Sequence, residues 1–161
     1  MTDQLHDEIT TGIEEHGRKI LVVEGDNKHH PFYYTIGNHL KGAPELLLIG
    51  AFEAGYATMV INMLSDHAVQ EKRPFINGQK VRTNEKALPM QIWDTTVIAK
   101  LEYTRLVSEY YQHKDYIVQQ VIIPDPKGHY PTDKRCHKRY RVPVLRPTVD
   151  LMADMRSTLV H

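Results

Sequence analysis

A carboxylate and an imidazole lie four residues apart in a short polar turn, at Asp125 and His129. The turn begins at Pro124 and follows residues 116–123, a nearly continuous apolar run that predicts a buried strand. A turn in this place can present both groups on a rigid support, where the carboxylate orients the imidazole as a general acid or base. Asp125 and His129 are therefore the candidate catalytic pair of a metal-independent hydrolase or transferase. The alternative, which the turn sequence favours, is that Asp125 accepts backbone N–H bonds and holds a tight turn.

Further polar side chains are placed where they could face a ligand. Glu45 opens a predicted strand after Pro44, and His16 ends a predicted helix. Each has a structural alternative, Glu45 as an exposed strand-end carboxylate and His16 as a cation that meets the helix dipole. The candidate ligand-binding residues are His16, Tyr34, Thr35, Glu45 and Lys127. We expect the assembled sheet to gather, at one open face or end, His16, Tyr34, Glu45, Asp125 and His129.

The C-terminal part of the chain is strongly basic. Residues 127–146 contain seven Lys and Arg residues against Asp133 alone, whereas the whole chain has 20 basic and 20 acidic residues. Such a segment can contact phosphates with salt-sensitive affinity, although a neutral chain lacks the overall basicity of most nucleic-acid binders. The alternatives are a solvated extension, or docking on an acidic surface such as residues 1–16 of a second subunit. The candidate phosphate-contacting residues are Lys134, Arg135, Lys138, Arg139 and Arg141.

Several classes of protein are disfavoured by the sequence. The glycine-rich phosphate loop, the dinucleotide fingerprint, the His-Glu-x-x-His zinc motif and the Gly-x-Ser-x-Gly elbow are all absent. The spacing of His29, His30 and His39 fits no metal geometry, so we expect no metal and no cofactor. Cys136 is the single cysteine, which excludes an intramolecular disulfide. The polar N-terminus and the lack of a membrane-length apolar run predict a cytoplasmic protein without a membrane partner.

The residues of these candidate sites must be positioned by the predicted elements. Apolar residues at every fourth position predict a helix that Gly17 ends, and a longer apolar stripe predicts a second helix over 53–72. A third helix is expected from Thr95 or Thr96 to about Tyr111. Short β-branched, aromatic or apolar runs predict strands. The predicted strands are 18–24, 32–36, 45–49, 88–94 and 116–123, the first three forming an antiparallel meander.

The fold class expected from this order is α+β. We predict a mixed, mainly antiparallel sheet of five or six strands with two to three helices on one face. The 161 residues suit a single domain. We place the domain at residues 1–133, followed by a basic extension, 134–161, packed on or flanking it, with a short helix expected over 149–157.

Four short segments occur in an order that is similar to a known family. They are His16-Gly17, Tyr33-Tyr34-Thr35-Ile36-Gly37, Pro44-Glu45-Leu46 and Pro124-Asp125-Pro126-Lys127-Gly128-His129-Tyr130-Pro131. Together they resemble the uncharacterised bacterial and phage domain-of-unknown-function family 4262, over residues 3–131. Ile123 and Thr132 stand where the family often has tryptophan. The resemblance implies the fold and a phage or mobile-element source, but it brings no activity.

The sequence therefore predicts a module that binds a small molecule or a protein partner. The partner could also be a second copy of the chain, in a homo-oligomer. The first alternative is the hydrolase or transferase that uses His129 and Asp125. The second is a nucleic-acid-associated protein that acts through residues 134–146. A pocket without a paired acid and base favours binding, whereas a pocket that both groups face favours the enzyme.

Overall fold

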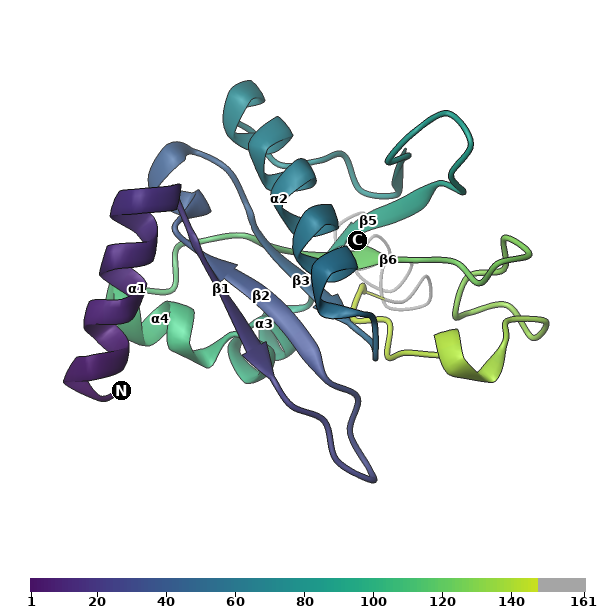
Figure 1. Ribbon diagram of the computed structural model, residues 1–161, viewed down its shortest axis with the longest axis horizontal. Coiled ribbons are helices and arrows are strands. Elements are labelled where there is room, and N and C mark those ends of the chain that lie inside the picture. Colours follow the sequence, from purple (N-terminus) through teal and green to yellow (C-terminus); the bar gives the residue numbers. More distant parts are fainter. Residues whose placement is uncertain (148–161) are drawn as a thin grey trace, which may run out of the picture.

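The computed structural model describes residues 1–147, which form one six-stranded sheet with helices packed against it (Figure 1). The strands are β1 (Lys19–Val23), β2 (Phe32–Ile36), β3 (Glu45–Ile49), β4 (Gln79–Val81), β5 (Met90–Asp94) and β6 (Val118–Ile122). The helices are α1 (Asp3–His16), α2 (Ala54–Glu71), α3 (Val97–Tyr103) and α4 (Arg105–Tyr111), with 3-10 turns η1 (Asn38–Lys41) and η2 (Lys138–Tyr140). The described part of the chain therefore has the predicted α+β class.

One pair of strands in this sheet is parallel. The strand order is β1-β2-β3-β6-β5-β4, and every neighbouring pair is antiparallel except β3 and β6. Glu45 lies opposite Val118 and Leu48 lies opposite Val121. This confirms the mixed, mainly antiparallel sheet and the meander of the first three strands. It also brings the chain that leaves β3 and the chain that leaves β6 to the same end of the sheet.

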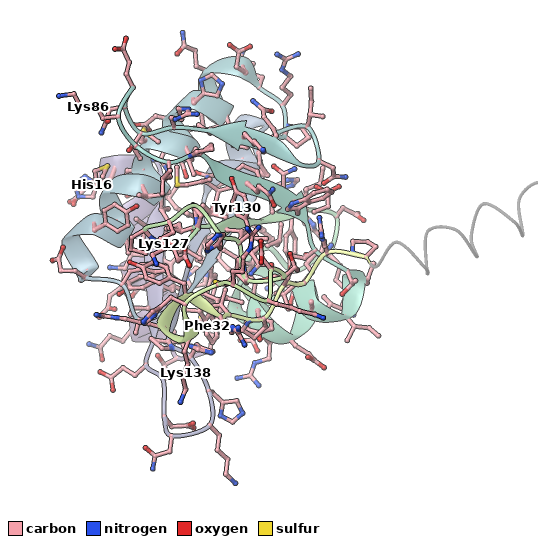
Figure 2. The ribbon with its side chains drawn as sticks, turned by 90° about the vertical axis from the view of Figure 1, so that its right-hand side faces the viewer. His16, Phe32, Lys86, Lys127, Tyr130 and Lys138 are labelled. Carbon is pink, nitrogen blue, oxygen red and sulfur yellow. The ribbon has the colours of Figure 1, made fainter. Side chains whose placement is uncertain are left out.

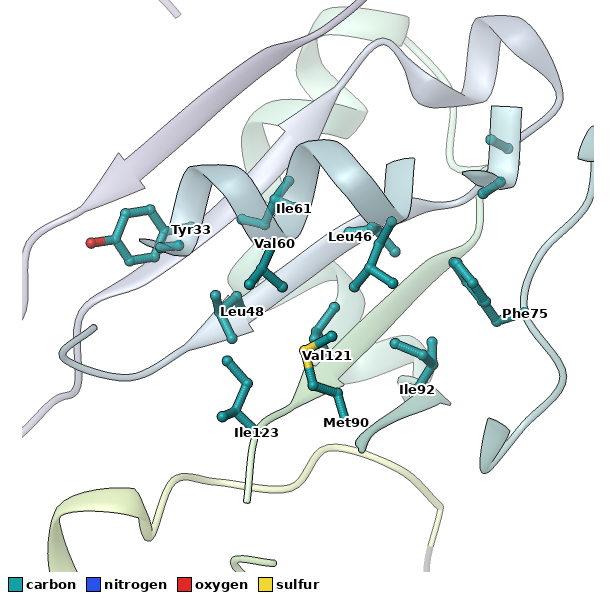
Figure 3. Close-up of a cluster of buried hydrophobic side chains, with 14 residues drawn as sticks. Tyr33, Leu46, Leu48, Val60, Ile61, Phe75, Met90, Ile92, Val121 and Ile123 are labelled. Atoms are coloured by element: carbon teal, nitrogen blue, oxygen red, sulfur yellow. The ribbon is translucent and has the colours of Figure 1, made fainter. Parts of the chain in front are cut away.

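Helices cover both faces of the sheet, and the prediction that they lie on one face was wrong. Leu46 and Leu48 pack with Val60 and Ile61 of α2 (Figure 3). The alternate residues of β3 pack on the other face in a second cluster, with α1 and α4. The physical reason is that residues 46–49 are all apolar and at most 2% exposed, so this strand needs cover on both sides.

The ends of the helices follow local signals, with one departure. The Thr2 side chain accepts from the N–H of Leu5, and Gly17 ends α1 with φ +86°, as predicted. The helix expected up to Tyr111 is instead broken at Thr104, between α3 and α4. The Thr104 hydroxyl donates to the carbonyl of Lys100 at 2.5 Å, and such back-bonding by a β-branched residue bends helices.

The described part of the basic segment lies along the domain. The side-chain amide of Gln120, in β6, donates to the carbonyl of Pro143 at 2.7 Å and accepts from the N–H of Leu145 at 2.8 Å. The Thr96 N–H donates to the Leu145 carbonyl at 3.0 Å. Residues 143–145 are therefore held against the sheet; the basic extension and its boundary at 133 stay predictions, and the helix predicted over 149–157 lies outside the described residues. No helix within residues 1–147 is long and apolar enough to span a membrane.

Candidate functional site

The expected gathering of five polar residues at one place does not occur. Glu45 begins β3 level with Val118, the first residue of β6, whereas Asp125 follows the last residue of that strand. Strand rise of about 3.3 Å per residue separates the two levels by at least roughly 13 Å. The Asp125 turn and Glu45 thus lie at opposite ends of the sheet. His16 lies on the surface at the end of α1 and contacts neither Glu45 nor Asp125. Its ring lies 3.7 Å from the Glu15 carboxylate.

Glu45 is a fully buried carboxylate with five hydrogen-bond donors. Its Oε1 accepts from the Thr35 hydroxyl at 2.8 Å and from the Asn38 N–H at 3.1 Å. Its Oε2 accepts from the Tyr111 hydroxyl at 2.5 Å and from the N–H groups of Gly37 and His39 at 3.3 and 3.1 Å. Burial raises the pKa of Glu45, and these bonds, that of Tyr111 foremost, act against the rise.

The hydrogen-bond network continues from Glu45 to the surface on the side of α2. The Asn38 amide donates to the Ser65 hydroxyl at 2.8 Å, and its oxygen accepts from Nε of Arg18 at 2.8 Å. The Arg18 guanidinium, 8% exposed, then donates to Asn62 at 3.0 Å and to Asp66 at 2.7 Å. One connected set of polar bonds therefore ties β2, β3, η1, α2 and α4 to Arg18, the residue before β1.

This network explains the recognised motifs structurally. Thr35, Gly37 and Glu45 come from the Tyr-Thr-Ile-Gly and Pro-Glu-Leu segments, and all three serve the same buried carboxylate site. Tyr34, 2% exposed, packs between the sheet and the helices α1 and α4, and burial raises its pKa to about 12. In this structure Tyr34, Thr35 and Glu45 do not reach solvent, so these parts of the motifs specify the fold.

The Asp125 turn has the geometry of its structural alternative. The carboxylate is 2% exposed and accepts from the N–H groups of Lys127 at 3.0 Å, His129 at 2.8 Å and His137 at 2.8 Å. Burial pushes the pKa of Asp125 up, but these bonds outweigh burial and hold it at about 2. Nδ1 of His129 lies 3.4 Å from the carboxylate. Asp125 thus joins two turns, 125–129 and 133–141, through backbone bonds.

A cleft of about 410 Å³ opens beside this turn, where the chain leaves β3 and β6. Its floor includes Met90 and Ile123, and three aromatic rings form a wall: Phe52 lies 6.1 Å, centroid to centroid, from both Tyr56 and Tyr140. Two carboxylates border it but are engaged, Asp125 as above and Glu53 with the N–H groups of Gly55 and Tyr56 at the start of α2. His129 does not line it. The cleft therefore has apolar and aromatic walls and no paired acid and base.

The candidate phosphate contacts fall into two groups. Arg135 pairs with Asp133 at 2.9 Å, and Arg141 donates to the carbonyls of Cys136 and Lys134. The exposed side chains of Lys134, Lys138 and Arg139 have no hydrogen-bond or ion-pair partner within residues 1–147, and neither has that of Lys127. Figure 2 views the end of the molecule that carries Lys127 and Lys138. Arg139 lines the cleft.

These features define a small α+β domain with an open cleft at the carboxyl ends of a parallel strand pair. Among residues 1–147, no cluster of His, Cys, Asp and Glu side chains is arranged to hold a metal ion. The family model described as "Domain of unknown function (DUF4262)" matches residues 12–137, and the chain belongs to this family, as its motifs predicted. No curated protein and no solved structure matches the chain.

Of the residues that line the cleft, the sequence singled out Asp125 and Arg139 but not the three aromatic residues of its wall. Phe52 and Tyr56 follow the apolar strand β3, just as the Asp125 turn follows β6, and Tyr140 arrives from the basic segment. The available signal was Gly50, which ends an apolar run and starts a polar and aromatic stretch, the same pattern that pointed to Asp125. What no local pattern indicated is that β3 and β6 are parallel neighbours.

Proposed function

We propose that the domain is a small-molecule binding module whose ligand lies in the cleft formed after β3 and β6. The observation that carries this proposal is the aromatic wall of Phe52, Tyr56 and Tyr140 above an apolar floor. The volume of about 410 Å³ is within the range of ligand pockets, which are mostly apolar with few polar groups. Ligands of open sheets commonly bind at the carboxyl ends of parallel strands. The ligand class that fits is planar and largely apolar.

The alternative of an acid–base enzyme has weaker support. Each oxygen of Asp125 already accepts from backbone N–H groups, and the His129 ring is not among the groups that face the cleft. A substrate in the cleft would therefore meet no paired acid and base. The hydrolase or transferase, the phage or mobile-element origin, the cytoplasmic location and self-association stay predictions of the sequence.

The proposal is tested with 8-anilinonaphthalene-1-sulfonate, an aromatic probe whose fluorescence rises in apolar surroundings. Ala51, exposed at the mouth of the cleft, is changed to Trp to fill it. The matched control places Trp at Gln70, an exposed position far along α2. We expect saturable binding that Ala51→Trp reduces at least tenfold and Gln70→Trp leaves unchanged.

A second variant tests the cleft independently, in case Ala51→Trp does not fold. Tyr56→Ala removes one of the three aromatic rings of the wall and adds no side-chain volume. Stacking on an aromatic ring is worth about 1–3 kcal/mol. We expect it to weaken probe binding about fivefold or more, with the unfolding curve of the variant as the check on its fold. Binding that both cleft variants leave intact contradicts the proposal.

A further inference from the structure

The electrostatic surroundings of the cleft favour an anion. Residues 125–141 contain six Lys and Arg residues and two Asp residues. Both Asp side chains are engaged, Asp125 with backbone N–H groups and Asp133 with Arg135. Glu53 also lines the cleft, and its carboxylate is engaged by the N–H groups of Gly55 and Tyr56. Of the charged side chains that line the cleft, Arg139 alone is therefore without a partner within residues 1–147. Residues 125–141 border the cleft through Asp125, Pro126, Arg139 and Tyr140, and their excess of positive charge forms a basic rim that attracts anions.

The cations of this rim are presented by backbone that Asp125 fixes. One of its oxygens accepts from the N–H of Lys127, and the other accepts from the N–H of His137, the residue before η2. The His137 ring in turn accepts from the N–H of Arg139 at 3.1 Å and caps η2. Lys127 and η2, which carries Lys138 and Arg139, are therefore tied to a single buried carboxylate.

Resting on the proposed function, we propose that the cleft binds a phosphorylated planar aromatic molecule, the chemistry of a nucleoside monophosphate. The aromatic base stacks against Phe52, Tyr56 and Tyr140. Arg139, which lines the cleft and has no partner within residues 1–147, binds the phosphate, and Lys127 and Lys138 neutralise its second charge. The guanidinium fork matches two phosphate oxygens at once, which a single ammonium group does not.

A phosphate explains the number of free cations better than a carboxylate does. One arginine suffices for a singly charged group, whereas Arg139 in the lining is accompanied by two lysines without partners within residues 1–147, Lys127 next to Pro126 and Lys138 next to Arg139, which suits a dianion. A free nucleotide is favoured over a nucleic-acid strand because the chain as a whole has 20 basic and 20 acidic residues. Phe52, Tyr56 and Tyr140 also wall a single cleft rather than a groove of several stacking platforms.

The experiment compares ribonucleoside 5′-monophosphates with the matching nucleosides, each titrated singly into the full chain by calorimetry. Arg139→Met removes the proposed phosphate contact, and Arg73→Met is the matched control, because Arg73 pairs with Glu71 at the far end of α2. We expect at least one monophosphate to bind about tenfold or more tightly than its nucleoside, about 1.4 kcal/mol. Arg139→Met should abolish this difference, higher salt should reduce it, and Arg73→Met should preserve it.

The remaining outcomes contradict the inference in distinguishable ways. Equal binding of nucleoside and monophosphate leaves the proposed function standing and removes the phosphate. The phosphate is likewise removed if 8-anilinonaphthalene-1-sulfonate binds the cleft but no monophosphate binds or displaces it. Binding of a short single-stranded oligonucleotide without binding of any monophosphate replaces the inference with strand recognition. If none of the probes binds in the cleft, the proposed function fails as well.

Discussion

Replacing Glu45 by Gln should destabilise the domain by about 2–4 kcal/mol. The two carboxylate oxygens accept five hydrogen bonds, and each oxygen accepts at least one from a backbone N–H, which cannot reverse its role. The –NH2 group of Gln accepts nothing, so either orientation leaves a buried N–H without an acceptor, at about 1–3 kcal/mol. The remaining bonds fall from charge-assisted to neutral strength, which adds about 1 kcal/mol.

Equilibrium urea unfolding followed by circular dichroism measures this loss. The control is Glu109→Gln, because the Glu109 carboxylate, 38% exposed, forms only surface ion pairs with Arg105 and the N-terminal amine among the described residues. We expect the control to change the free energy of unfolding by less than about 1 kcal/mol. A Glu45→Gln loss as small as that of the control, with an unchanged denaturant slope, would refute the hydrogen-bond account of this residue.

Three further predictions concern the same network and the Asp125 turn. Tyr111→Phe removes a hydroxyl that donates to Glu45 and accepts from the Gly37 N–H at 2.7 Å, so we expect a loss of about 1–2 kcal/mol in urea unfolding. Gly37→Ala should lower the midpoint of thermal unfolding more than Tyr111→Phe does. Gly37 has φ +124°, and an added Cβ would lie 2.8 Å from the Gly17 carbonyl oxygen. A midpoint equal to that of the wild type would contradict the strain argument. Because the pKa of Asp125 is held at about 2, below its ordinary value of 3.8, its contribution is present above pH 4 and is lost as the pH falls toward 2. Amide exchange at His129 and His137 should therefore accelerate over that interval, and pH-independent protection at these two amides would count against the bonds to Asp125.

Local patterns in the sequence predicted most elements of the fold. The helix end at Gly17 and the apolar runs have causes within a few residues, so this helix end and the strands could be predicted. The interruption at Thr104 could not, because a threonine within a helix can bend it or leave it straight. The helices on both faces were missed because the apolar run over 46–49 was too short to distinguish a one-sided strand from a two-sided one.

The candidate site was predicted less well because it depends on pairing between distant segments. The turn role of Asp125 was visible in its own sequence and is the role that its bonds support. The separation of Asp125 from Glu45 follows from the parallel register of β3 and β6, which alternation of apolar residues does not encode. For the same reason the burial of Glu45 under Tyr111, a residue sixty-six positions away, had no local signal.

The location of the ligand is tested most directly by an amide chemical-shift map of the isotope-labelled chain during titration with 8-anilinonaphthalene-1-sulfonate. The perturbed amides should cluster at the carboxyl ends of β3 and β6 and near Tyr140. The amide chemical shifts of Gly37 and Glu45 should not change. Perturbations centred on the Glu45 end of the sheet, or scattered over the surface without saturation, would contradict a binding cleft at the opposite end.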